Sequence, residues 1–148
     1  MTITYHRIGS ESLNLLADCA DDVFDAAIQL DYARAFVADP RSILIVARSS
    51  DQVVGQIVAI VHHHLDAPSD LFIENLGVAQ AWQRRGIART LLSKALVTGA
   101  DLGAVSAWVA TEAENEPANA LYRTFGARPE PFAMYSLSDQ AFKNARIT

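Results

Sequence analysis

Apolar residues gather in short runs along the chain, and these runs predict its strands. Residues 42–48 and 53–61 are rich in β-branched side chains and flank a polar Ser-Ser-Asp-Gln sequence, which indicates a β-hairpin. Residues 2–8, 71–78 and 104–110 predict further strands. A last apolar run at residues 131–137 is expected to close the sheet.

Helical periodicity predicts the elements between these strands. Residues 13–30 are helical in character, and residues 32–38 continue as a short helix. The first of these helices would place four carboxylates on one face, those of Asp18, Asp21, Asp22 and Asp25.

Two more helices follow in the second half of the chain. From Ile87 the apolar side chains recur on one face, which predicts an amphipathic helix ending at Gly99 or Gly103. Pro117 favours the start of another helix, which runs through residue 125 and stops at Gly126. This order of strands and helices predicts a mixed sheet with helices packed on it, an α/β sandwich.

Length and composition support one domain over residues 1–148. The chain is 51% hydrophobic and contains no linker-like or low-complexity stretch. No run approaches the roughly 18 apolar residues of a membrane helix, and residues 1–13 lack the hydrophobic core of a signal peptide, so we expect a cytoplasmic protein without a membrane partner. A single cysteine, Cys19, forms no internal disulfide and builds no cysteine-type zinc site.

The charge distribution argues against nucleic acid as a partner and favours a cationic one. The net charge is −5, and residues 1–39 hold seven acidic residues against two arginines. Arg84, Arg85, Arg89 and Lys94 form one basic island among acidic segments.

The basic island begins at a turn from a strand into the amphipathic helix. The first N–H groups of a helix are unpaired and favour phosphate, and Gly86 and Ala88 carry too little side chain to block its approach. The glycine patterns of Rossmann and Walker loops are absent from this segment. The turn is therefore predicted to bind a pyrophosphate through the N–H groups at the start of the helix, without a Rossmann or Walker loop.

Two motifs in this region resemble those of the GNAT superfamily of N-acetyltransferases. Residues 83–88, Gln-Arg-Arg-Gly-Ile-Ala, fit its pattern of Gln or Arg, two residues, Gly, one residue, and Gly or Ala. Residues 115–126 fit its second pattern through Asn115, Ala118, Leu121, Tyr122 and Gly126. The resemblance implies a mixed, mostly antiparallel sheet of about six or seven strands flanked by about four helices.

The resemblance also implies acetyl-CoA as the cofactor. Backbone N–H groups at residues 84–88 would hold its pyrophosphate, the backbone of Val78 would contact the acetyl end, and Asn115 would contact the pantetheine arm. The cofactor-binding residues implied in this way are Leu76, Val78, Gln83, Arg84, Arg85, Gly86, Ile87, Ala88 and Asn115.

Acetyl transfer needs a neutral amine, a donor for the developing oxyanion and a proton for the departing thiolate. Tyr122 stays protonated at neutral pH and is the candidate acid. Strand alternation places Glu74 on the same face as Leu76 and Val78, which makes it the candidate base. A purely structural pairing of Glu74 with an arginine is the alternative.

Acidic segments suggest a polycationic acceptor. The chain is also similar to the small aminoglycoside 3-N-acetyltransferases of the gentamicin-modifying type, although Asn75 stands where these have an aspartate. The resemblance implies an antibiotic-resistance type of activity, with acceptor contacts from Asp22, Asp25, Glu74, Glu112 and Glu116. Two alternatives stay open: another amine acceptor (a polyamine, an amino sugar or a peptide N-terminus), and a non-catalytic acyl-CoA-binding module.

Three consecutive histidines, at positions 62–64, raise the question of a metal. Only His62 and His64 could point together on a strand, and no further ligand spacing accompanies them, so no metal site is predicted. Dimers are common in the GNAT superfamily, which makes a homodimer possible here.

Overall fold

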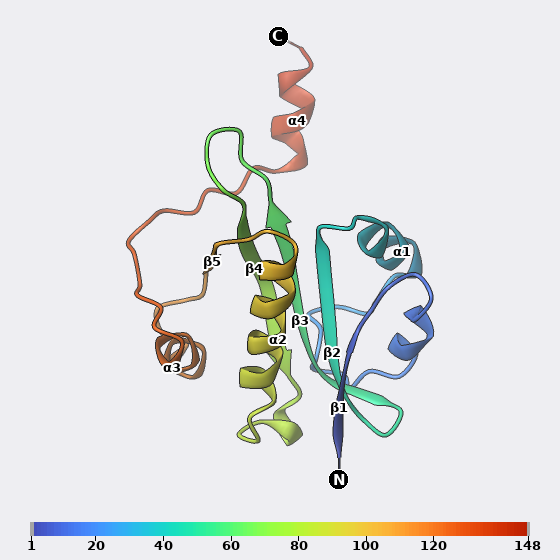
Figure 1. The fold of residues 1–148 in the computed structure, drawn as a ribbon. Helices are drawn as coiled ribbons and strands as arrows, with labels where there is room; N and C mark the ends of the chain where they lie inside the picture. The colour runs from blue at the N-terminus through green and yellow to red at the C-terminus, as the bar shows by residue number, and fades with distance from the viewer. Residues whose placement is uncertain (1, 148) are drawn as a thin grey trace. The chain divides into compact units, whose positions relative to one another are not determined.

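The computed structural model describes residues 2–147. They divide into two compact units, the first ending at Glu112 and the second beginning at Ala113, and each is described by itself below. In the first unit the strands form one sheet in the order β1-β2-β3-β4-β5. All neighbours are antiparallel except β4 and β5, which are parallel (Figure 1). The strands are β1 (Ile3–Arg7), β2 (Ser42–Ser49), β3 (Gln52–His62), β4 (Asp70–Val78) and β5 (Ser106–Val109). The predicted mixed, mostly antiparallel fold is confirmed.

Two adjacent residues of β3 show what covers each face of the sheet. A Cβ atom on Gly55 would lie 3.0 Å from Ile87 of helix α2 (Ile87–Asp101). Gln56 points to the opposite face, where its Nε2 donates to the carbonyl oxygen of Val23 at 3.2 Å. Helix α2 therefore covers one face and the N-terminal segment covers the other, as a sandwich requires.

Burial on both faces explains the continuous apolar runs of the central strands. In β2, Ile43 and Val46 point to opposite faces of the sheet, and both are fully buried. The same holds for Val54 and Ile57 of β3. A strand with one solvated face would alternate apolar and polar residues instead. The predicted hairpin is confirmed, with Ser50 at a φ of 53° in its turn.

The helix predicted over residues 13–30 is wrong. A single 3-10 turn, η1 (Leu13–Leu16), is followed by irregular chain. Helix α1 (Leu30–Ala38) begins only at Leu30. The N–H of Val53 donates to Asp18 O at 2.8 Å, and the N–H of Ala20 donates to Val53 O at 2.9 Å, so the segment pairs with β3. Aspartates are poor interior residues of helices because their side chains compete for backbone groups.

A β-bulge interrupts β4 at Glu74. Asn75 pairs with Val58 and Ile73 pairs with Ala59, which leaves Glu74 as the extra residue between them. Alternation restarts after the bulge, and Val78 pairs with Gly55 on the α2 face. The prediction that Glu74, Leu76 and Val78 share one face is therefore wrong.

Helix α2 and the chain after it agree closely with the sequence. The helix ends where Gly103 takes a left-handed φ of 100°, and Gly99 lies inside it, in contact with Leu71 of β4. The helix then connects β4 to the parallel strand β5, which is the usual way to join parallel neighbours.

The second unit contains helices α3 (Glu116–Thr124) and α4 (Asp139–Ala145). Pro117 lies in the first turn of α3, and Gly126 follows its end with a φ of 81°, as predicted. The predicted strand at residues 131–137 is wrong: this segment has no strand partner among residues 2–147, and Phe132, Met134 and Tyr135 are exposed. The sheet accordingly has five strands rather than six or seven.

Helix α4 was not expected from the sequence. A Lys143 Nζ to Asp139 Oδ2 contact of 2.9 Å supports it at helical spacing. Among residues 2–147, no helix is long and apolar enough to cross a membrane.

Candidate active site

The predicted pyrophosphate turn joins the end of β4 to the start of α2. Ala79 donates its N–H to Val54 O at 2.9 Å, which holds the start of the turn against β3. A 3-10 turn, η2 (Gln80–Trp82), follows, and the side chain of Gln83 reaches back to donate to Val78 O at 3.1 Å. The first residue of the motif therefore closes the loop onto the strand.

Two left-handed residues shape this turn. Arg84 has a φ of 61° and Gly86 a φ of 79°, with Gly86 at the N-cap of α2. No side chain within residues 2–147 caps this helix start, and a Cβ on Gly86 would meet nothing within 4 Å. Free amides, the positive end of the helix and an open approach together fit the diphosphate of CoA.

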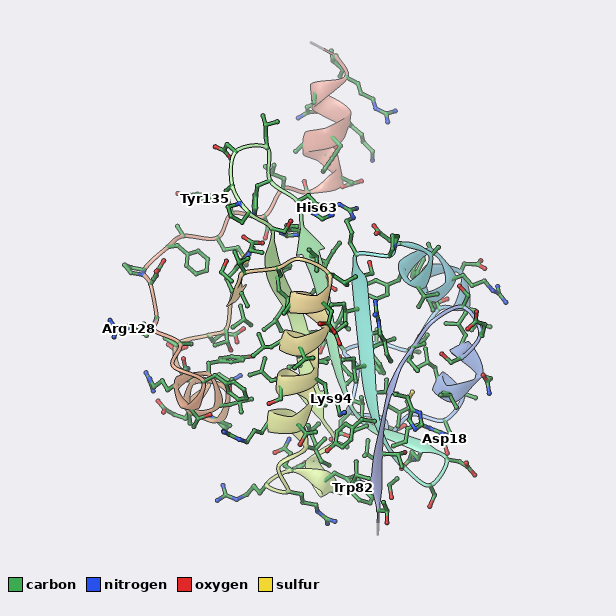
Figure 2. The ribbon with its side chains drawn as sticks, viewed as in Figure 1. Asp18, His63, Trp82, Lys94, Arg128 and Tyr135 are labelled. Carbon is green, nitrogen blue, oxygen red and sulfur yellow. The ribbon has the colours of Figure 1, made fainter. Side chains whose placement is uncertain are left out.

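The arginines surround the same turn. The guanidinium of Arg85 lies 4.7 Å from the centre of the Trp82 ring and donates to Ala81 O at 3.3 Å. Arg84 is exposed at the turn, and Arg89 is exposed in the first turn of α2. Trp82 itself packs partly against the core, at the lower end of the view in Figure 2. The turn thus keeps a positive surface for an anion.

Asp22 holds the turn rather than lining an acidic stripe. Its Oδ2 accepts the N–H of Gln80 at 2.7 Å, from a position 58 residues earlier in the chain. Asp18 instead lies beside the hairpin, where it accepts from Gln52 Nε2 at 3.3 Å (Figure 2). The aspartates of residues 18–25 therefore point to different partners, and the predicted single acidic face is wrong.

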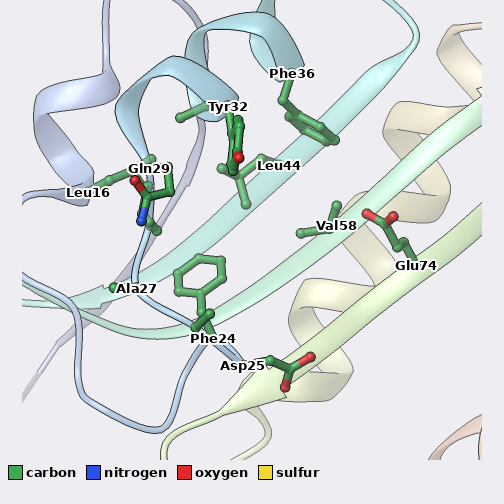
Figure 3. A pocket seen from close by; sticks show the side chains of 13 residues that line it. Leu16, Phe24, Asp25, Ala27, Gln29, Tyr32, Phe36, Leu44, Val58 and Glu74 are labelled. Carbon is green, nitrogen blue, oxygen red and sulfur yellow. The ribbon is translucent and has the colours of Figure 1, made fainter. Parts of the chain in front are cut away.

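A cavity of about 320 Å³ opens on the face of the sheet covered by the N-terminal segment (Figure 3). Residues 24–36 form one wall, and Leu44 of β2 and Val58 of β3 form part of the other. Among the predicted acceptor residues, Asp25 and Glu74 both line this cavity. Its volume lies in the range of small-molecule binding sites.

The bulge in β4 determines where Glu74 points. Because Glu74 is the extra residue, its side chain lines the cavity beside Val58, while Val78 faces α2. Glu74 is exposed and has no ion pair with an arginine among residues 2–147, so the structural pairing considered from the sequence is not observed.

Close backbone packing holds the cavity wall to the strand. A Cβ on Gly77 would lie 2.7 Å from Val23 O, a distance that real Cβ atoms essentially never show. Only glycine lets the segment before Asp25 approach β4 this closely. This apolar wall was not predicted from the sequence. The helical spacing of Tyr32 and Phe36, which both lie in the wall, is the signal that could have indicated it.

Tyr122, Asn115 and Glu116 belong to the second unit. Asn115 caps helix α3: its Oδ1 accepts the N–H of Ala118 at 3.3 Å. Tyr122 is partly buried, and this loss of water raises the pKa of its phenol. Glu116 is exposed in the first turn of α3, and Glu112 is exposed at the end of the first unit.

Two of the three consecutive histidines, His62 and His64, lie beside the carboxylate of Asp70. His64 Nε2 lies 2.9 Å from Asp70 Oδ2, and His62 Nδ1 lies 3.7 Å from Asp70 Oδ1. Within the described chain, no three His, Cys, Asp or Glu side chains are placed to hold a metal ion. Burial, reinforced by Asp18, raises the pKa of the Cys19 thiol, which disfavours a thiolate nucleophile there.

Comparison with known proteins identifies the class. Residues 10–127 match the acetyltransferase (GNAT) family, so the chain belongs to this family. Members of this family use acetyl-CoA, so the match agrees with the predicted class of enzyme, N-acetyltransferase, and with the predicted cofactor.

Individual relatives are more distant. An uncharacterized N-acetyltransferase of Mycobacterium bovis is 28% identical over 91 residues, which make up 62% of this chain and 56% of that protein. The chain therefore spans little more than half of that curated relative.

Solved structures are similar over almost the whole chain. An aminoglycoside acetyltransferase from an uncultured soil metagenomic sample has a TM-score of 0.80 and 26% identity, covering 93% of this chain and 99% of that one. The aminoglycoside N-acetyltransferase AAC(6')-Iy in complex with CoA has a TM-score of 0.74 and 15% identity over 91% and 98% of the two chains. The second likeness shows the fold alone.

Proposed function

We propose that this protein is an acetyl-CoA-dependent N-acetyltransferase that acetylates a primary amine of a cationic small molecule, an aminoglycoside at its 3-N position. The observation that carries the proposal is the arrangement along β4. This strand ends in the turn suited to a diphosphate, and a few residues earlier it presents Glu74 to a cavity that also contains Asp25.

Opposite charges at two points along β4, at its middle and at its end, support a two-substrate reaction. The uncapped start of α2 and the arginines favour an anion, while the two carboxylates of the cavity favour an ammonium group. The likeness to a soil-derived aminoglycoside acetyltransferase at 26% identity favours an aminoglycoside among cationic amines.

Each chemical step has a candidate group in this chain. Acetyl-CoA supplies a thioester-activated acetyl group. Glu74 accepts the proton that the acceptor ammonium must lose before its nitrogen can form the C–N bond. As the C–S bond breaks, the phenol of Tyr122 donates its proton to the sulfur, and the backbone N–H of Val78 stabilises the carbonyl oxygen. In this proposal Asp25 holds the acceptor, and Asn115 contacts the pantetheine arm as well as capping α3.

An acceptor panel tests the proposal. Purified protein is incubated with acetyl-CoA and kanamycin, gentamicin, spermidine or a short peptide, and release of free thiol is measured. We expect release with the aminoglycosides above the rate without acceptor. Release with spermidine or the peptide alone would overturn the aminoglycoside assignment, and absence of release with every acceptor would favour a non-catalytic acyl-CoA-binding module.

The position of acetylation needs the product itself. NMR of acetylated kanamycin should show the new amide on the 3-amino group. Because AAC(6')-Iy has the same fold, acetylation of the 6'-amine is the outcome that would contradict the 3-N assignment.

A further inference from the structure

The cavity that contains Glu74 is mostly hydrocarbon. Nine of the thirteen side chains that line it carry carbon alone: Leu16, Phe24, Ala26, Ala27, Ile28, Ala33, Phe36, Leu44 and Val58. The other four are Asp25, Gln29, Tyr32 and Glu74. A hydroxylated polycation finds few side-chain hydrogen-bonding partners on this wall, whereas an apolar group placed against it is removed from water.

The two carboxylates of the cavity are set apart from its far side. In the view of Figure 3 the carboxylates of Asp25 and Glu74 lie on one side, and Leu16, Ala27 and Gln29 lie on the other. Between them stand Phe24, Tyr32, Phe36, Leu44 and Val58. An amine held at Glu74 would therefore have its carbon skeleton against aromatic and aliphatic side chains.

The volume is sufficient for a substantial apolar group. An apolar cavity of about 150 Å³ binds benzene, and this one measures about 320 Å³. Tyr32 is 77% exposed at the rim, so the apolar wall is accessible from solvent.

We propose that the cavity accepts primary amines carried on an apolar body, an alkyl or aryl-alkyl group, and that such amines are a second class of acceptor. The inference rests on the proposed acetyl transfer and specifies the chemical group that carries the reacting amine. The ammonium group pairs with Glu74 and Asp25, and the carbon skeleton displaces water from the wall formed by residues 24–36. The chemistry is unchanged: a C–N bond forms, the C–S bond breaks, and the amine proton leaves through Glu74.

A series of linear alkylamines, from ethylamine to hexylamine, isolates the apolar contribution because their amines have similar basicity. Each methylene that enters the cavity is expected to raise kcat/KM about fourfold, the transfer free energy of a buried methylene converted to a rate. Ethanolamine, which replaces the terminal methyl of propylamine by a hydroxyl, should react more slowly than propylamine. Kanamycin is measured in parallel.

Two matched substitutions on α1 locate the effect. Ala33 lines the cavity and is half-buried, whereas Ala35 on the same helix is exposed and outside it. Ala33→Phe should fill the cavity and abolish the gain from hexylamine, while Ala35→Phe should leave it unchanged. Circular dichroism confirms that both variants fold. Should Ala33→Phe fail to fold, thermal protection of the unmodified protein by hexylamine over ethylamine provides the second measurement.

The outcomes separate this inference from the proposed function. Thiol release with kanamycin but no increase along the alkylamines would overturn the inference and leave aminoglycoside acetylation standing. An increase along the alkylamines without kanamycin turnover would support the inference and remove the aminoglycoside. Absence of release with every amine would overturn acetyl transfer itself.

Discussion

Tyr122 combines a protonated phenol with partial burial. Removal from water raises its pKa above the usual value of about 10, so the phenol keeps its proton through neutral and mildly alkaline pH. As the proposed acid, it should support a kcat that falls only above about pH 10. Tyr122→Phe is expected to lower kcat about 10²- to 10⁴-fold with little change in the KM for acetyl-CoA. Steady-state kinetics across pH check both statements, and an unchanged kcat would exclude the phenol as the acid.

Glu74 and Asp25 line the same cavity but are expected to act differently. Glu74→Gln keeps the shape and removes the base, so kcat should fall about 10²-fold or more. Asp25→Asn removes one charge that holds the acceptor, so the acceptor KM should rise while kcat changes little. Kinetics of both variants with kanamycin separate the roles. Equal losses of kcat would show that neither carboxylate is specifically the base.

The local geometry of the pyrophosphate turn could be predicted from the sequence. Gln83 and Gly86 lie in a six-residue motif, and their contacts are made within the same turn. The hydrogen bond of Asp22 could not be predicted, because its partner, the N–H of Gln80, lies 58 residues away in the chain. A carboxylate in an acidic run offers no local sign of whether it binds a ligand or a distant backbone amide.

At the scale of an element, helix α2 carries a matched pair of glycines. Gly86 at its start and Gly103 after its end both have a positive φ, and a Cβ at either would meet nothing within 4 Å. Alanine at each site should therefore destabilise the fold by a similar amount, roughly 1–2 kcal/mol, through backbone strain alone.

Only one of the two glycines faces the proposed diphosphate. Gly86→Ala should therefore raise the Kd for CoA about tenfold, and Gly103→Ala should leave it unchanged. Isothermal titration calorimetry measures the Kd, and denaturant unfolding verifies the matched loss of stability. Equal Kd values in the two variants would place the diphosphate elsewhere.

Elements with a regular apolar pattern, whether one periodic face or a continuous run, were predicted well, and irregular segments were not. Helix α2 and the β2–β3 hairpin follow their patterns because burial acts along their whole length. Residues 13–30 show a helical pattern, yet the backbone at residues 18–20 pairs with Val53 instead. The bulge at Glu74 was equally invisible, because one extra residue in a strand leaves the composition of that strand unchanged.

For the first unit as a whole, charge and topology act together. The segment that covers the cavity face of the sheet belongs to residues 1–39, which carry an excess of acidic over basic residues equal to the net charge of the whole chain. The basic turn lies instead at the end of β4, where α2 begins. The molecule therefore offers one surface to a cation and another to an anion.

This asymmetry predicts a dependence on ionic strength. Charges attract a ligand over about 30 Å at 0.01 M salt but over only about 8 Å at 0.15 M. Between these limits, kcat/KM for the polycation kanamycin should fall about tenfold. Hexylamine carries a single charge and gains from apolar contact, which salt does not screen, so its kcat/KM should fall far less. Both are measured at saturating acetyl-CoA, which removes the salt dependence of cofactor binding. Parallel slopes for the two amines would show that the acidic N-terminal segment does not guide the acceptor.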